Sequence, residues 1–275
     1  MECEAEGESE GAGQPINEID TEAVLSVLRP IWSKVPETAS RLRGRIENVL
    51  DAARALGFRD GPNPATWRGH LKTLLPARQN LTRGHHAALP YDQMPEFMTA
   101  LRSRRSLASL ALELCILTAT RTSETLGARW EELDLERGIW TIPAARMKME
   151  HTHRIPLSDG ALGILKGLPR LSGNPYVFPG NVKGRPLSSS AMEMQLRRMK
   201  RKDITVHGFR STFRDWASEQ TSFPSETCEH ALAHSISDKA EAAYRRGDQF
   251  EKRRLLMEAW AEFCDQIVGG KDQRL

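Results

Sequence analysis

One apolar stretch limits what this chain can fold into more than any other segment: LASLALELCILTAT, residues 107–120. Glu113 interrupts it, and it is shorter than the run of about 20 apolar residues with which a helix crosses a bilayer. A helix that is apolar on all sides and does not span a membrane lies inside a protein. We therefore expect a buried helix here. The 275 residues, 39% of them hydrophobic, can form one large or two ordinary domains.

Apolar residues at helical spacing also precede this stretch. A helix predicted to end at Gly57 carries them on one face: Leu42, Ile46, Val49, Leu50, Ala53 and Leu56. Residues 63–75 are predicted to form another helix, with Pro64 in its first turn. Residues 76–90 lack periodicity and are rich in polar and basic residues, so we expect a domain boundary there.

Beyond the boundary the pattern is mostly helical, with one interruption. Helices are predicted over 94–120, 188–201, 207–220, 225–234 and 239–246, with a last one reaching 268. Two short β-prone arms, 138–143 and 152–157, flank a turn that carries Arg146 and Lys148, and PYVFP at 175–179 predicts a third strand. The expected fold class is mainly α (α+β): a small helical domain and a mostly helical one with a small β-hairpin or three-stranded sheet. The expected limits are 1–15 for a disordered acidic tail, 16–80 for the small domain, 81–90 for a linker and 91–275 for the larger domain.

Neither the start of the chain nor its cysteines indicate export. The segment MECEAEGESEGAGQP has neither the basic start nor the apolar run of a secretion signal. The cysteines are scattered, without a CxxC pair: Cys3, Cys115, Cys228 and Cys264. This pattern favours reduced thiols over a zinc site or a disulfide framework. The expected location is the cytoplasm.

The net charge of +3 is unevenly distributed. Residues 1–24 carry acidic side chains and no Lys or Arg, whereas basic residues crowd the segment 180–214. They are Lys183, Arg185, Arg197, Arg198, Lys200, Arg201, Lys202, Arg210 and Arg214. Such segregation predicts a polyanionic partner, although a solvated helix face explains a lone RRMKRK run equally well.

Six residues, Arg210 again among them, stand where they can carry chemistry: Arg121, Lys148, His207, Arg210, His234 and Tyr244. Each has an ordinary reading, such as an arginine satisfying the last carbonyls of a helix or an exposed lysine in a turn. Together, and without an Asp/Glu cluster for metal ions, they fit phosphoryl chemistry run by positive charge. Two arginines can grip a phosphodiester and stabilise its transition state. Tyr244 sits beside arginines, which favour ionisation of a phenol whose reference pKa is about 10.

The order of these residues strongly resembles that of the tyrosine recombinases, and specifically the integrases of prophages and genomic islands. The resemblance rests on five boxes: TRTSE, RMKMEHTHRIPLS, HGFRSTFRDWA, LAH and AAYRRGD. It covers roughly residue 16 to the end, and a chance match to five ordered boxes is negligible. One departure is that such relatives begin with an arm-type DNA-binding domain and a fuller core-binding domain, so the small domain is expected to be truncated.

The resemblance implies a role for each residue. Tyr244 would be the nucleophile that forms a 3′-phosphotyrosyl link, and Arg121 and Arg210 would hold the scissile phosphate. Lys148 would protonate the leaving 5′-oxygen, and His207 would accept a proton. His234 would bind the phosphate by a hydrogen bond, and Glu124 would orient the site. The reaction would need no cofactor, metal or ATP.

The resemblance also implies partners. Family members act as tetramers on two DNA duplexes, through a Holliday junction, and accessory DNA-bending or directionality proteins are possible partners. The small domain and its linker would clamp DNA with phosphate contacts. The expected DNA-binding residues are Arg78, Arg83, His85, His86, Lys183, Arg197, Arg198, Lys200 and Arg201.

Three alternatives stay open at the level of sequence. The first is a non-catalytic DNA-binding regulator in which 188–201 and 207–220 form a helix-turn-helix, although the short glycine turn of that motif is missing. The second is an integrase remnant that keeps the catalytic residues and no longer assembles. The third is a type IB topoisomerase, which reseals the same strand. The integrase-like residues of the five motifs argue against it.

Overall fold

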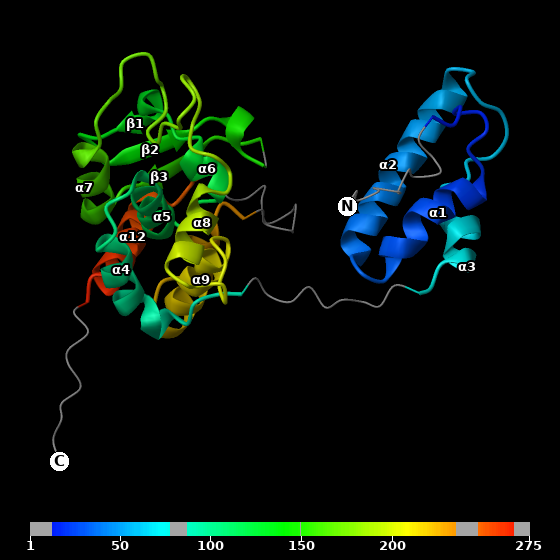
Figure 1. The fold of residues 1–275 in the computed structure, drawn as a ribbon. Helices are drawn as coiled ribbons and strands as arrows, with labels where there is room; N and C mark the ends of the chain where they lie inside the picture. The colour runs from blue at the N-terminus through cyan, green and yellow to red at the C-terminus, as the bar shows by residue number, and fades with distance from the viewer. Residues whose placement is uncertain (1–12, 78–86, 149, 235–246, 267–275) are drawn as a thin grey trace, which may run out of the picture. The chain divides into compact units, whose positions relative to one another are not determined.

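The computed structural model describes residues 13–77, 87–148, 150–234 and 247–266 (Figure 1). The chain divides into two compact units, Met1–Arg83 and Gly84–Leu275, which we call the N-terminal and C-terminal units. Each unit has a hydrophobic core of its own.

The N-terminal unit is a small helical bundle of α1 (Thr21–Trp32), α2 (Pro36–Ala55) and α3 (Lys72–Leu74). The side chain of Asp20 accepts a hydrogen bond from the backbone nitrogen of Ala23 at 2.9 Å and so caps α1. The buried face of α1 consists of Val24, Leu25, Leu28 and Trp32. This face packs on α2, so the small helical unit predicted from periodicity is present.

The helix predicted over 63–75 is wrong in most of its length. Asn63 turns the chain, because its side chain accepts a hydrogen bond from the backbone nitrogen of Ala65 and donates to Asp51. Gly69 has a φ of +73°, in the left-handed region, and interrupts the turn Trp67–Leu71. Only the three residues of α3 are α-helical in this stretch.

The described part of the C-terminal unit contains eight labelled helices: α4 (Met94–Arg102), α5 (Leu107–Leu117), α6 (Thr122–Leu126), α7 (Asp159–Gly167), α8 (Ala191–Arg198), α9 (Gly208–Gln220), α10 (Ser225–Ala231) and α12 (Phe250–Cys264). Helix α5 is the predicted buried helix, and the side chain of Ser106 caps its start. Its one charged residue, Glu113, accepts a hydrogen bond from Arg102 at 2.6 Å. The buried carboxylate therefore has a partner, as burial of a charge requires.

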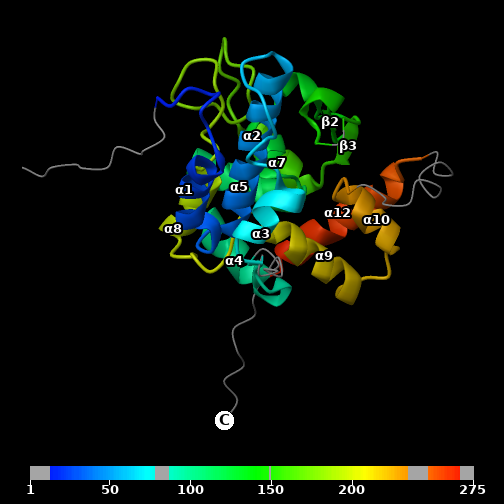
Figure 2. The same cartoon turned by 90° about the vertical axis from the view of Figure 1, so that its right-hand side faces the viewer.

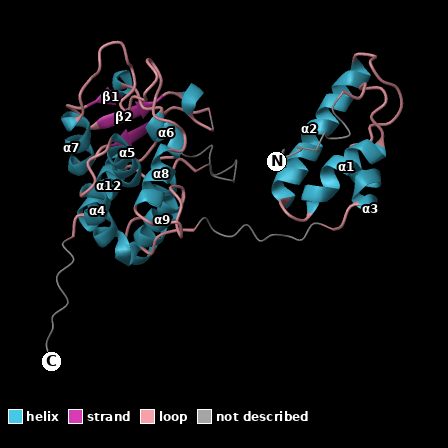
Figure 3. Cartoon of the chain, viewed as in Figure 1, coloured by secondary structure: helices cyan, strands magenta, loops and turns pink. Residues whose placement is uncertain are grey.

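A three-stranded antiparallel sheet in the order β1-β2-β3 lies at one end of this unit (Figure 3). Its strands are β1 (Leu133–Asp134), β2 (Ile139–Ile142) and β3 (His153–Pro156). The register places Trp140 opposite Ile155, and both side chains are buried. The predicted fold class, mainly helical with a small sheet, is confirmed.

The third strand, however, is not the one predicted. It is β1, whereas the segment 175–179 forms only isolated bridges, such as that of Tyr176 to Arg129. Pro175 and Pro179 lack the backbone N–H that a strand interior needs, so this segment cannot continue a ladder.

The last described helix packs within its own unit. Helices α9 and α12 lie side by side in Figures 1 and 2, and they share an aromatic cluster of Phe213, Trp216, Trp260 and Phe263. The indole nitrogen of Trp260 donates to the backbone oxygen of Ile116 in α5 at 2.9 Å. Helices α5, α9 and α12 thus form the rigid centre of the unit.

Candidate active site

A hollow of about 460 Å³ on the C-terminal unit brings together side chains from separate segments. Its lining residues are Arg121, Lys148, His207, Arg210, Glu229, Ala233 and His234. Five of them were predicted as catalytic from the sequence. The sixth predicted residue, Tyr244, lies outside the described residues.

Arg121 stands at the start of α6 and is held by Glu124. The carboxylate of Glu124 accepts one hydrogen bond from the Arg121 guanidinium at 2.7 Å and another from its backbone nitrogen at 2.8 Å. Glu124 is only 3% exposed, so little water competes with these bonds. A second guanidinium nitrogen donates to the backbone oxygen of Ala233 at 3.3 Å. The arginine therefore reaches the hollow in a fixed orientation.

Arg210, in the first turn of α9, is only 5% exposed. Its Nη1 donates to the backbone oxygen of Ala119, and its Nη2 donates to that of Leu232 at 2.5 Å. Burial, with a further contribution from the charge of Arg121, lowers the pKa of Arg210 to about 10. The guanidinium still carries its charge at neutral pH, so two cations lie at one hollow.

Two alanines with left-handed backbone present carbonyls to these arginines. Ala119 has a φ of +50° and Ala233 a φ of +48°. Such backbone is costly for a residue with a Cβ, and strained residues of this kind cluster at functional sites. Here the strain turns the oxygen of Ala119 toward Arg210 and that of Ala233 toward Arg121.

His234 lies between a carboxylate and a guanidinium. Its Nδ1 is 2.6 Å from Glu229, and its Nε2 is 3.2 Å from Nη2 of Arg210. Because a carboxylate only accepts a hydrogen bond, the contact with Glu229 assigns a proton to Nδ1 of His234. Glu229 also accepts a hydrogen bond from Arg214 at 2.6 Å. Burial alone would raise the pKa of Glu229, but the bonds from Arg214 and His234 hold it below its ordinary value.

Sequence reasoning did not single out Glu229 or assign Arg214 a partner. The signal available was the spacing in EHALAH, where Glu229 precedes His234 by five residues at the end of a helix. Because α10 ends at Ala231, the chain turns there and brings the two side chains together.

Lys148 and His207 are exposed, as is His234. Lys148 lies in the turn between β2 and β3, and His207 is the residue before α9. Both side chains line the same hollow as the two arginines, where a ligand from solvent can reach them.

The predicted DNA-binding residues fall into three groups. Arg78, Arg83, His85 and His86 lie outside the described residues. Lys183, Arg197, Arg198 and Lys200 are exposed on the C-terminal unit and are not among the residues that line the hollow. Arg201 is half-buried and forms an ion pair with Asp203 at 2.7 Å.

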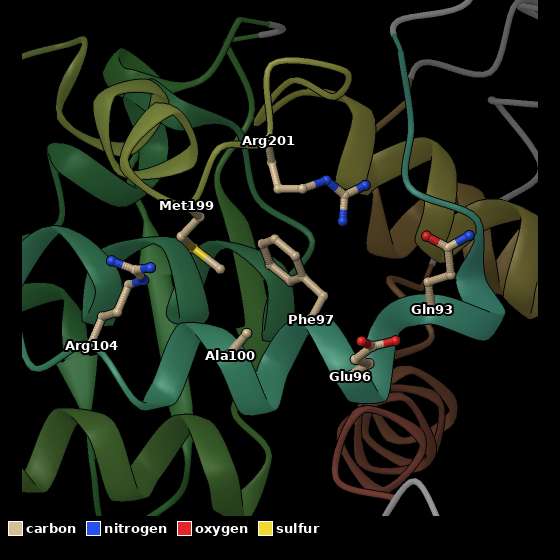
Figure 4. A pocket seen from close by; sticks show the side chains of 7 residues that line it. All are labelled: Gln93, Glu96, Phe97, Ala100, Arg104, Met199 and Arg201. Carbon is tan, nitrogen blue, oxygen red and sulfur yellow. The ribbon is translucent and has the colours of Figure 1, made fainter. Parts of the chain in front are cut away.

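A second hollow, of about 260 Å³, differs in chemistry (Figure 4). Its lining residues are Gln93, Glu96, Phe97, Ala100, Arg104, Met199 and Arg201. The side chain of Met199 points toward Phe97, and the carboxylate of Glu96 lies across the hollow from Arg104 and Arg201. It contains none of the predicted catalytic residues, so we do not assign the reaction to it.

The described residues lack both a metal-binding group and a membrane-spanning helix. No three His, Cys, Asp or Glu side chains there are grouped so that they could hold a metal ion. Within the same residues, no helix is both long and apolar enough to cross a membrane.

Known proteins match the chain along most of its length. The model of the phage integrase family matches residues 88–249, and that of the phage integrase central domain matches residues 10–70. Prophage integrase IntA of Escherichia coli K12 is 34% identical over 262 residues, which cover 93% of this chain and 61% of the relative. The integrase of Enterobacteria phage P4 is 30% identical over 271 residues, which cover 91% of this chain and 60% of the relative. The chain thus spans about three-fifths of the length of these relatives.

Solved structures show the same fold. A dimer of lambda integrase residues 75–356 bound to a COC′ core site matches with a TM-score of 0.55 and 19% identity, over 81% of each chain. A lambda integrase tetramer bound to a Holliday junction matches with a TM-score of 0.56 and 18% identity, over 81% of this chain and 66% of that one. The fold is therefore that of lambda integrase. Because the family model covers more than half of the sequence, the chain belongs to the phage integrase family.

Proposed function

We propose that this chain is a site-specific DNA recombinase that integrates or excises a mobile element. One observation carries the proposal: Arg121, Lys148, His207, Arg210 and His234, which are scattered through the sequence, line one hollow. The relatives named prophage integrase and the fold shared with lambda integrase support it. A pair of guanidinium groups at one site matches the charge of a phosphodiester in its transition state.

The proposed reaction exchanges one ester bond for another. The Tyr244 oxygen attacks the phosphorus, the bond to the 5′-oxygen breaks, and a 3′-phosphotyrosyl link forms. The phenolic proton passes to His207, and Lys148 gives a proton to the departing 5′-oxygen. Because the ester is conserved, a free 5′-hydroxyl can reverse the step, and no ATP is consumed.

The arginines and His234 have separate parts in this scheme. Arg121 and Arg210 bind the nonbridging oxygens of the phosphate, and Glu124 fixes the first of them. His234 binds the phosphate by a hydrogen bond, and the contact of its Nδ1 with Glu229 orients the ring.

Double-stranded DNA is the proposed partner. We infer that residues 16–80 form a core-binding domain, 81–90 a linker and 91–275 the catalytic domain, which the matches to two family models support. The proposed phosphate contacts are made by Arg78, Arg83, His85, His86, Lys183, Arg197, Arg198, Lys200 and Arg201. The tetramer of lambda integrase on a Holliday junction supports a homotetramer on DNA, and a DNA substrate favours a place on the bacterial nucleoid.

The test is a covalent adduct. The chain is mixed with a pool of nicked duplexes of randomised sequence, labelled at the 5′ end of the cut strand, and separated under denaturing conditions. The expected result is labelled DNA that stays attached to the protein and is lost in Tyr244→Phe. Tyr176→Phe is the matched control, because Tyr176 lies outside the hollow, and it should form the adduct normally.

The two readings without catalysis give a different result. A non-catalytic DNA-binding protein or an inactive remnant would retard DNA in a native gel and form no adduct. An adduct that persists in Tyr244→Phe would remove Tyr244 from the mechanism.

A further inference from the structure

Lys148 reaches the hollow from an exposed turn. Arg146, two residues before it in the chain, holds that turn in place. Among the described residues Lys148 itself makes no hydrogen bond or ion pair, and its side chain is exposed. Arg146, in contrast, is only 20% exposed at its side chain. It is not among the residues that line the hollow.

Arg146 uses both ends of its guanidinium fork. Its Nη1 donates to both carboxylate oxygens of Glu132, at 2.5 Å from Oε1. Its Nη2 donates to the backbone oxygen of Glu124 at 2.7 Å. A guanidinium bound in this way has little freedom, because its donors lie in a fixed plane.

The groups around Arg146 favour this arrangement. Glu132, whose side chain is 5% exposed, also accepts hydrogen bonds from the indole of Trp140 at 3.0 Å and from the backbone nitrogen of Arg129 at 3.3 Å. A Cβ added to Gly127 would stand 2.7 Å from Nη2 of Arg146. Glycine at this position therefore allows the guanidinium to reach α6.

The same contact connects the turn to the phosphate clamp. The backbone oxygen of Glu124 binds Arg146, and the carboxylate of Glu124 binds both the guanidinium and the backbone nitrogen of Arg121. One chain of hydrogen bonds thus runs from the Lys148 turn through Arg146 and Glu124 to Arg121.

We propose that Arg146 is a positioning residue that sets the place of Lys148 relative to the phosphate held by Arg121. The inference rests on the proposed function and adds to it a residue that need not touch DNA. Its physical basis is that proton transfer to the leaving oxygen requires Lys148 within hydrogen-bond reach, and a shift of about 1 Å costs on the order of 100-fold in rate.

The test variant is Arg146→Lys in the full chain. Lysine keeps a positive charge beside the buried Glu132 but cannot bind Glu132 and the Glu124 oxygen together. With saturating DNA, single-turnover adduct formation should fall on the order of 100-fold, while DNA binding stays unchanged. Arg137→Lys, at an exposed pair with Asp134 beside β1, is the matched control and should cut at the wild-type rate.

A sulfur leaving group separates positioning from general damage. When the 5′-oxygen is replaced by sulfur, the bond from phosphorus to sulfur breaks and the thiolate leaves with the electron pair. It needs no proton from Lys148, because a thiol with a pKa of about 8.5 is a far better acid than an alcohol. Both Lys148→Ala and Arg146→Lys should therefore cut the sulfur substrate at close to the wild-type rate.

Two results would overturn the inference. One is that Arg146→Lys slows cleavage of the oxygen and sulfur substrates by the same factor. The other is that Arg146→Lys cleaves the oxygen substrate at the wild-type rate. If Arg146→Lys does not fold, Arg146→Gln combined with Glu132→Gln removes both buried charges and is put to the same pair of substrates. If the wild type attacks neither substrate, the proposed function fails, and this inference fails with it. Inactivity of the wild type can be told apart from failure of the inference alone, in which the wild type cleaves DNA and only the Arg146 variants behave differently from expectation.

Discussion

His153, the first residue of β3, shows what burial near charged groups does to a single side chain. Burial, and next the charge of Arg253, lower its pKa to about 4. Arg121 acts in the same direction, whereas Glu124 and a backbone hydrogen bond with Ala231 act against it. The ring is therefore neutral over the physiological range and packs beside the site without adding a third positive charge.

This pKa predicts a loss of stability in mild acid. An unfolded histidine takes up a proton near pH 6.5, whereas the folded one resists until about pH 4. The folded state is thus unaffected above pH 6.5 and loses stability as the pH falls toward 4. His153→Gln should reduce the drop in unfolding free energy between pH 7 and pH 5 by about 2 kcal/mol, measured by denaturant titration at each pH. The control is His151→Gln, at an exposed position. If the unfolding free energy falls equally between pH 7 and pH 5 in the wild type and both variants, the lowered pKa of His153 is contradicted.

His207 and Arg210, at the start of α9, line the hollow, and Gly208 fixes where this helix starts. A Cβ on Gly208 would stand 2.2 Å from the backbone oxygen of Ala87. The same oxygen accepts a hydrogen bond from the backbone nitrogen of Thr205 at 3.0 Å, and Thr212 donates to the oxygen of Leu89 at 2.6 Å. The segment after residue 86 therefore lies along the start of the helix, next to His207.

Gly208→Ala should displace this segment and destabilise the C-terminal unit. The clash is with backbone, which cannot rotate away, so the unfolding free energy should fall by about 1–3 kcal/mol in thermal or denaturant melts. Gly163→Ala in α7 is the matched control, because a Cβ there meets nothing within 4 Å. It should be neutral or stabilising by up to about 1 kcal/mol, since alanine favours a helix. The close contact would be disproved by identical melts for the two variants.

The described residues form two hydrophobic cores, one in each unit. Leu28 belongs to the core of the N-terminal unit and Leu112 to that of the C-terminal unit, and both are fully buried. Because cooperativity follows the extent of a shared core, each unit should unfold as its own cooperative element.

Calorimetry of the full chain should therefore show two transitions. Leu28→Ala should lower the midpoint of one and Leu112→Ala that of the other, each through a loss of about 2–5 kcal/mol of unfolding free energy. A single transition that both variants shift equally would show that the units fold together.

The sequence by itself determined most of the described helices, the hairpin and the family. Periodicity is a local property: the buried run 107–120, the arms around residue 147 and the ordered boxes depend on residues a few positions apart. It misjudged 63–75 and 175–179, where Gly69 and the two prolines override the local pattern.

Only the tertiary structure decided which partners orient the site. Glu229 meets His234 after the end of α10, Arg210 meets the oxygen of Ala119 from 91 residues away, and Arg146 reaches the oxygen of Glu124. These contacts join elements that are distant in the chain, and nothing in the spacing of residues specifies how such elements pack. The chemistry of a phosphate site can thus be seen in residue types, whereas its geometry exists only once the helices and the sheet have packed around α5.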